Sequence, residues 1–254
     1  MRNILVICRK ELGSYFASPI AYILLTLFGV IFGYFFWVVL GSFINYSMEA
    51  QMSGASYPMN LNEQIIRPLL SNVAVIGLFF IPLITMRLFA EEKRSGTIEL
   101  LATSPIRDIE IVIGKWLASV VLYACLLLFT AINFAFLFRY GHPDWKPLLV
   151  AYLGLLLQAG GLLALGTFIS TLTKNQIIAG AVTFGVCLLL WIVGWVDYET
   201  APWAHVLSYF SVVNHFESFA RGVLDSKDVI FYATVIFMGL FFTARSMESL
   251  RWRS

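Results

Sequence analysis

The sequence has little charge. Only 13% of its 254 residues are Asp, Glu, Lys or Arg, whereas an ordinary soluble domain has about 25%. Apolar residues make up 59% of the chain, and its mean hydropathy is +0.82. A soluble globular protein of this composition could not cover its surface with polar groups, so the sequence predicts an integral membrane protein. The net charge of +2, from 17 basic and 15 acidic residues, gives no support to nucleic-acid binding.

The sequence also lacks the patterns of disulfide, metal and nucleotide sites. Its cysteines lie far apart with no CxxC spacing, so we expect buried apolar side chains. Its histidines form no HExxH pattern, and we expect them in loops or at headgroup level. Gly114 and Lys115 resemble the end of a phosphate-binding loop, but Ile109 stands where that loop needs a glycine. We therefore expect that the chain binds no metal or cofactor, has no catalytic residue and is not an enzyme. The residues concerned are Cys8, Cys125, Cys187, His142, His205 and His215.

Six apolar stretches reach the length that a membrane-spanning helix needs, which is about 17–25 residues. The fourth and fifth form a hairpin, because only a few residues separate them. The expected fold is all-α, with six transmembrane helices in a single domain over residues 1–254. The stretches lie at about 20–44, 69–85, 111–138, 148–172, 177–196 and 229–244.

The distribution of Lys and Arg predicts the orientation, because cytoplasmic loops are enriched in them. With a cytoplasmic N-terminus, twelve lie inside and five outside. An even number of spans then places both termini in the cytoplasm. Lys115, five residues into the third stretch, is counted with the inner charges.

Apart from that lysine near an end, the six stretches contain no Asp, Glu, Lys, Arg or His. Ionisable residues inside a bilayer usually perform ion-coupled transport or voltage sensing. Their scarcity argues against a proton- or sodium-coupled carrier and against a voltage sensor.

Two segments outside the spans are expected to lie against the membrane. Residues 1–19 have the spacing of a basic amphipathic helix, typical of the membrane interface, although a simple topogenic leader is the alternative. The aromatic outer segment 197–228 is expected to form short, re-entrant-like helices at the bilayer edge, with a free loop as the alternative. Within it, Asp225 and Asp228 flank Lys227 and are interpreted as a solvated charge cluster.

The loop at 87–110 contains a charge run, a break at Ser95–Gly96 and a short amphipathic helix expected over Thr97–Thr103, before Pro105. Ile98 and Leu101 share an apolar face with Ala102. A helix of about two turns is too short to be stable alone, so it needs a surface on which to dock.

This loop resembles the cytoplasmic coupling loop of the ABC type-2 permease family, in which an acidic stretch leads into G-T-I-E-L-L-A-T-S-P or a close variant. The start at Arg9–Leu12, with Ser18–Pro19 leading into the first span, resembles that family's N-terminal interface helix. Residues 214–225, followed by Asp228 and Val229, resemble the outer segment of its gliding-motility-type branch.

The resemblance implies a permease subunit in a bacterial cytoplasmic (inner) membrane. Its implied partners are a cytoplasmic ABC ATPase dimer that binds ATP and magnesium, a second permease subunit that is a copy or a paralogue, and a membrane protein with a large outer domain. The implied ATPase contacts are Glu91, Glu92, Arg94, Gly96, Thr97, Ile98, Glu99, Leu101 and Thr103.

Three functions remain open. An exporter subunit is favoured. A mechanical coupler that transmits ATPase motion to an outer partner would use the same coupling helix. A membrane-embedded enzyme would need a polar constellation that the sequence does not show.

Small residues suggest how two permease subunits meet, because they let helix backbones approach closely in lipid. Gly29 and Gly33 lie on the first span, where we expect Phe28, Phe32 and Phe36 to form the adjoining rim of the interface, and Gly180 and Gly185 lie on the fifth. The same glycines could instead serve packing within one chain. Since type-2 permeases usually meet near these two spans, the resemblance favours the dimer.

Overall fold

The computed structural model describes residues 2–53, 60–98, 106–141, 143–195 and 209–251. These residues form helices and no strands, which confirms the all-α fold class. In chain order the helices are α1 (Arg2–Ala17), α2 (Pro19–Ser53), the π-helical turn η1 (Asn62–Ile66), α3 (Arg67–Thr85), α4 (Ala90–Ser95), α6 (Asp108–Tyr140), α7 (Trp145–Leu172), α8 (Gln176–Ile192), the 3-10 turn η2 (Val193–Trp195), α10 (Val212–Ala220) and α11 (Ser226–Arg251).

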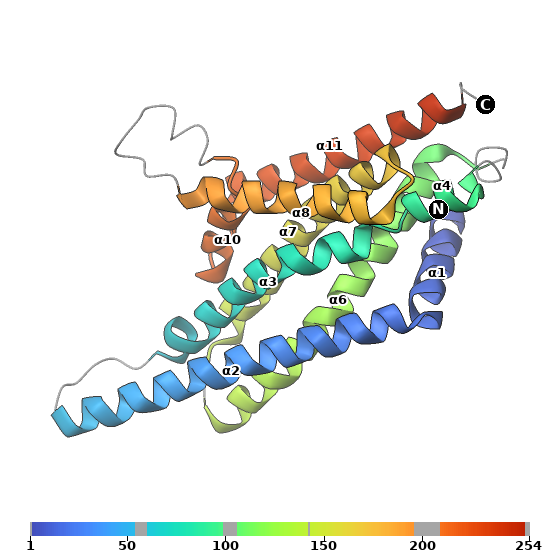
Figure 1. The fold of residues 1–254 in the computed structure, drawn as a ribbon. Helices are drawn as coiled ribbons and strands as arrows, with labels where there is room; N and C mark the ends of the chain where they lie inside the picture. Colours follow the sequence, from blue (N-terminus) through green and yellow to red (C-terminus); the bar gives the residue numbers. More distant parts are fainter. Residues whose placement is uncertain (1, 54–59, 99–105, 142, 196–208, 252–254) are drawn as a thin grey trace.

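Six helical stretches are long and apolar enough to cross a membrane, which confirms the predicted number. The stretches that contain α3 and α7 are the most buried, whereas α2, α8 and α11 bury much less of their surface in the chain. Figure 1 shows the six crossing the molecule in one general direction, with α2 at its edge. The peripheral helices α2, α8 and α11 therefore expose apolar faces to lipid or to another subunit.

Several helices continue beyond the apolar stretches that predicted them. The first span was expected to end near residue 44, but α2 continues to Ser53. With 35 residues at 1.5 Å each, α2 is about 50 Å long, compared with about 30 Å for the hydrocarbon core of a bilayer. Hydropathy locates the end of the apolar stretch that lies in the bilayer, whereas the helix itself continues until the backbone leaves the helical conformation.

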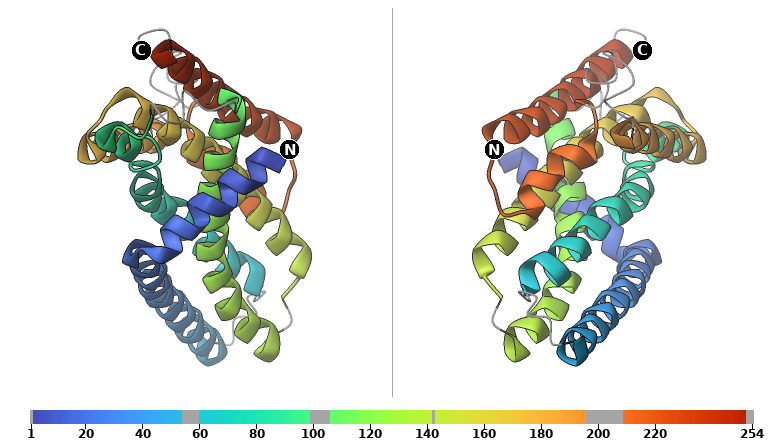
Figure 2. Two further views of the ribbon diagram at one scale, coloured as in Figure 1. Left: turned by 90° about the vertical axis from the view of Figure 1, so that its right-hand side faces the viewer. Right: turned by 90° about the vertical axis from the view of Figure 1, so that its left-hand side faces the viewer.

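The two ends of the bundle differ. At one end, α1 turns away from α2 next to Pro19 and packs across α6, as Figure 2 shows. The same end holds α4 and the C-terminal end of α11, and we call it the α1–α4 end (Figure 1). At the opposite end, α10 packs against α7 and α3.

Small residues allow the central helix α7 to pack closely against its neighbours. A Cβ added at Gly239 of α11 would lie 2.8 Å from the backbone of Ala164 on α7, closer than real contacts allow.

The hairpin of α7 and α8 is closed by Asn175, whose side chain accepts a hydrogen bond from the backbone N–H of Ile177 at 2.9 Å and so caps α8.

The cysteines fit the expectation in part. Cys8 and Cys187 are buried, Cys125 is half-buried, and none of the three forms a disulfide.

The described part of the segment 197–228, which we expected on the outer side of the membrane, differs from the prediction in where its charged side chains lie. Residues 196–208 lie outside the described residues, and residues 212–220 form α10. Asp228 is 1% exposed and pairs with His215, which is also buried. The interpretation of Asp225 and Asp228 as a solvated cluster is therefore wrong for Asp228, and His215 is not a loop histidine. The turn between α10 and α11 folds the two side chains onto each other.

Candidate functional site

The charge run that follows the second span forms the short helix α4. Glu91 and Glu92 lie in its first turn, and Lys93 and Arg94 in its last, as the helix dipole favours. Gly96 ends the helix with a φ of +76°, in the left-handed region that favours glycine. The sequence located this break but did not predict a helix before it.

Side chains from other helices hold the bend between α3 and α4, by which we mean residues 84–90. The Ser170 hydroxyl of α7 accepts hydrogen bonds from the backbone N–H groups of Phe89 and Ala90, both at 3.1 Å. The Tyr15 hydroxyl of α1 donates to the carbonyl of Ile84 at 2.8 Å. Burial raises the pKa of Tyr15 well above its ordinary value, so the hydroxyl keeps its proton and remains a donor. The bend is therefore fixed to both α1 and α7.

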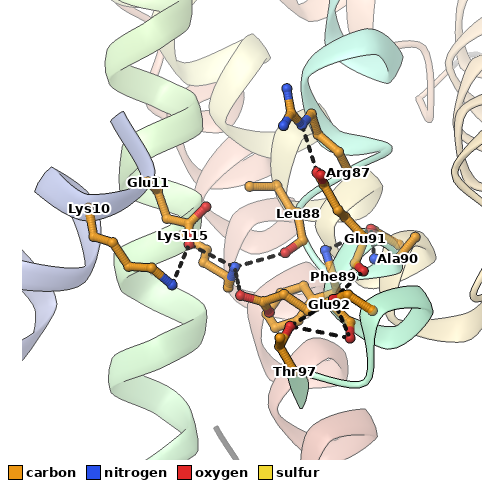
Figure 3. Close-up of polar contacts among 12 residues, drawn as sticks. Lys10, Glu11, Arg87, Leu88, Phe89, Ala90, Glu91, Glu92, Thr97 and Lys115 are labelled. Atoms are coloured by element: carbon orange, nitrogen blue, oxygen red, sulfur yellow. Dashed lines mark hydrogen bonds and ion pairs between the residues drawn. The ribbon is translucent and has the colours of Figure 1, made fainter. Parts of the chain in front are cut away.

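A buried lysine of α6 makes a third attachment. Lys115 is 1% exposed. Its Nζ atom donates to Oε1 of Glu11 on α1 at 3.0 Å, to Oε1 of Glu92 on α4 at 2.8 Å and to the carbonyl of Leu88 in the bend at 2.9 Å. Figure 3 shows these contacts converging on the one ammonium group.

The placement of Lys115 corrects the sequence interpretation. It was counted only as one of the inner charges that set the orientation, but it lies two turns inside α6 and is buried among α1, α4 and the bend. Its partners are far away in the sequence, and a single charge near the end of an apolar run resembles the boundary of a span. The available signal was a lysine inside that run, because a buried ammonium needs carboxylate partners.

A cleft of about 520 Å³ lies between α1, α4 and the start of α6, with Lys115 in its wall. Glu91 in this wall pairs with Nε of Arg87 at 3.0 Å, and the Arg87 guanidinium lies over the Tyr15 ring. Oε2 of Glu92 is buried and has no hydrogen-bond partner among the described residues. The cleft thus gathers both signs of charge beside α4.

The structure brings together six of the nine predicted contact residues, all in and directly after α4. Glu91, Arg94, Gly96 and Thr97 are exposed, whereas Glu92 and Ile98 are half-buried. Glu99, Leu101 and Thr103 lie outside the described residues. The helix expected over 97–103 therefore remains a prediction beyond Ile98.

One comparison decides the family. The family model of the ABC-2 family transporter proteins matches residues 5–243. The chain belongs to this family. No curated protein matches it.

Membership of the ABC-2 family agrees with the six apolar helices and makes the chain a multi-pass membrane permease subunit of an ABC transporter. In such transporters a partner subunit, not the permease, is the ATPase. The α1–α4 end, which holds the buried lysine, belongs to the matched region.

The glycines proposed for the interface between two ABC-2 subunits fall into two groups. A Cβ added at Gly33 or Gly185 would meet nothing within 4 Å. At Gly29 it would lie 3.5 Å from Phe129, and at Gly180 3.4 Å from Met86, so these two contact their own chain.

Two of the aromatic neighbours on α2 were misplaced. Phe28 and Phe32 are both fully buried in this chain, where they pack edge-on against Phe80 and Phe134. They cannot form the rim of an interface between chains. The period of the helix turns them toward α3 and α6.

Proposed function

We propose that the chain is the membrane half of an ATP-driven exporter, which converts ATP hydrolysis by a separate cytoplasmic ATPase into movement of its spans. The observation that supports this most is the bend between α3 and α4. Backbone groups of the bend are bonded by Tyr15 of α1, Lys115 of α6 and Ser170 of α7. A force applied at α4 would thus reach three helices of the bundle.

The ATPase would bind at the α1–α4 end, which we place in the cytoplasm of a bacterial inner membrane with both termini. The binding surface would comprise the exposed face of α4, Gly96, Thr97 and Ile98, and the sequence that follows to Thr103. The acidic first turn of α4 and the apolar side chains of residues 98–102 suit a groove with a basic rim and a dry floor.

The complex would contain two permease subunits, which would contact each other through α2 and α8. The sequence of α10 and the turn after it supports the gliding-motility-type branch, and with it an additional membrane protein that has a large outer domain.

The test is a pair of substitutions on the predicted coupling helix. Leu101→Asp places a charge on the apolar face shared with Ile98, whereas Leu100→Asp places the same charge on the opposite side of that helix. We expect Leu101→Asp to abolish co-purification of the ATPase in mild detergent and its stimulation, while membrane insertion is unchanged. Leu100→Asp should retain both.

Equal behaviour of the two variants would contradict the docking assignment. A second outcome distinguishes the exporter from the mechanical coupler. If the ATPase binds and is stimulated, no substrate class crosses the proteoliposome membrane, and a partner with an outer domain changes conformation with ATP, then the chain is a mechanical coupler.

A further inference from the structure

We propose that Lys115 is the joint that makes α1, α4 and α6 move as one body when the ATPase acts on α4. This inference rests on the proposed function, and it assigns Lys115 as a positioning residue for coupling. It acts through its partners and is not a contact of the ATPase.

The first argument is the use of all its protons. An ammonium group has three donors, and those of Lys115 go to Glu11, Glu92 and the Leu88 carbonyl at 2.8–3.0 Å. The three acceptors belong to α1, α4 and the bend, and the lysine itself belongs to α6. One atom therefore joins four parts of the α1–α4 end.

The second argument is charge. Two carboxylates converge on one buried ammonium, and both are mostly buried, with 14% of each side chain exposed. If the lysine is replaced by a neutral residue, Glu11 and Glu92 lose their common partner in a poorly solvated place, where a carboxyl without a counter-ion takes up a proton. Without Lys115 the site therefore loses the ion pairs that link α1 to α4.

The third argument is the path of the attachments. On its other side α4 is fixed to α7 by the neutral hydrogen bonds of Ser170, and α1 packs against α6 and α2. The pairing of Glu11 and Glu92 through Lys115 links α1 to α4. Loss of the lysine should thus leave α4 attached to α7, with the Tyr15 hydroxyl as the remaining hydrogen bond from α1 to the bend, so that α1 follows α4 less closely.

The test measures that motion directly, in the full permease–ATPase complex. Spin labels are placed on exposed Arg9 of α1 and Ser95 of α4, as cysteines in a background without Cys8, Cys125 and Cys187. Ser95 lines the cleft beside α1 and is not one of the nine predicted ATPase contacts, and the labelled parent is used only with its ATPase stimulation retained. Their separation is measured with ADP and with a non-hydrolysable ATP analogue. In the parent protein we expect the same separation in both states. In Lys115→Met the separation between the labels should lengthen with the analogue, and the distribution of separations should broaden in both states.

Three further variants sharpen the result. Lys115→Arg keeps the charge and should restore most of the parent behaviour. Lys174→Met removes an exposed lysine at the same end and should change nothing. Glu92→Met removes only the α4 contact, and it gives a second answer if Lys115→Met does not fold. Stimulation of the ATPase should fall about tenfold in Lys115→Met and in Glu92→Met, within the usual range of coupling between sites.

The outcomes separate this inference from the proposed function. If the ATPase co-purifies and is stimulated but the Lys115→Met and Glu92→Met separations match the parent, Lys115 is not the joint and the proposed function stands. A parent separation that changes with nucleotide also overturns the inference. If no ATPase binds the parent protein, the proposed function fails, and this inference fails with it.

Discussion

His215 and Asp228 form a buried pair, with Nδ1 of the imidazole 2.7 Å from Oδ1 of the carboxylate. Nε2 of the same ring lies 2.8 Å from the carbonyl oxygen of Tyr209. A carbonyl only accepts, so Nε2 must carry a proton. A further proton then lies between Nδ1 and the carboxylate. The pair binds α10 to the first turn of α11.

Removing the histidine should destabilise the protein strongly. His215→Ala leaves the Asp228 carboxylate buried without its partner, and breaking a buried pair in this way costs about 3–5 kcal/mol. The measurement is the free energy of unfolding by denaturing detergent. Asp225→Asn is the matched control, because Asp225 makes an exposed pair with Lys227, and solvent screens exposed pairs so that they add little to stability. Equal losses in the two variants would contradict the assignment.

Glu217 of α10 should make stability depend on pH. Hydrogen bonding to Arg221, aided by Arg67, lowers the pKa of the Glu217 carboxyl. A carboxyl with a lowered pKa in the folded state stabilises that state above its unfolded pKa, and the effect is lost as the pH falls through the folded value. We therefore expect the parent to exceed Glu217→Gln in stability at pH 7 and to lose that advantage below about pH 4.

The effect of Glu217 should be small, about 1 kcal/mol or less, because its side chain is half exposed and solvent screens the pair. It is measured as the difference in Tm between the parent and Glu217→Gln across the pH range. A difference that grows as the pH falls would show that the pairing with Arg67 and Arg221 is wrong.

The apolar runs were sufficient to predict the six spans of this fold, but not the contacts at its ends. Six spans follow from hydropathy because each must bury about 20 residues in lipid. The helix α4 was missed because six residues are not stable alone, and Ser170 and Lys115 support it from other helices. His215 and Asp228 are 13 residues apart on two helices, so only the fold brings them together.

ATP turnover should not need an ion gradient. The two charged groups that the structure buries near the span ends are both engaged: Lys115 by its three acceptors, and Asp228 by His215. Each therefore holds parts of its own chain together, a structural role that does not require ion-coupled transport. In proteoliposomes, ATP hydrolysis by the complex should be unchanged when ionophores dissipate the proton and sodium gradients. The detergent-solubilised complex, which holds no gradient, is the control, and loss of activity with ionophore in liposomes alone would refute this.

The last prediction concerns the interface between two permease subunits. Among the described residues, a Cβ added at Gly33 or Gly185 would meet nothing within 4 Å, whereas one at Gly180 would lie 3.4 Å from Met86. Gly33→Leu and Gly185→Leu should therefore keep the chain folded but hold two backbones apart, since close approach in lipid depends on small residues. Gly180→Leu should lower the stability of the single chain first.

Crosslinking between chains measures the interface in a background without native cysteines. Single cysteines replace Trp37 on α2 and Val182 on α8, both of which are exposed in the single chain. We expect crosslinks in the parent and their loss in Gly33→Leu and Gly185→Leu, because a helix pair separated by a leucine side chain no longer brings the thiols within reach. Crosslinks that persist in both variants, or that never form in the parent, would place the interface on another face, such as the exposed apolar side of α11 around Phe237.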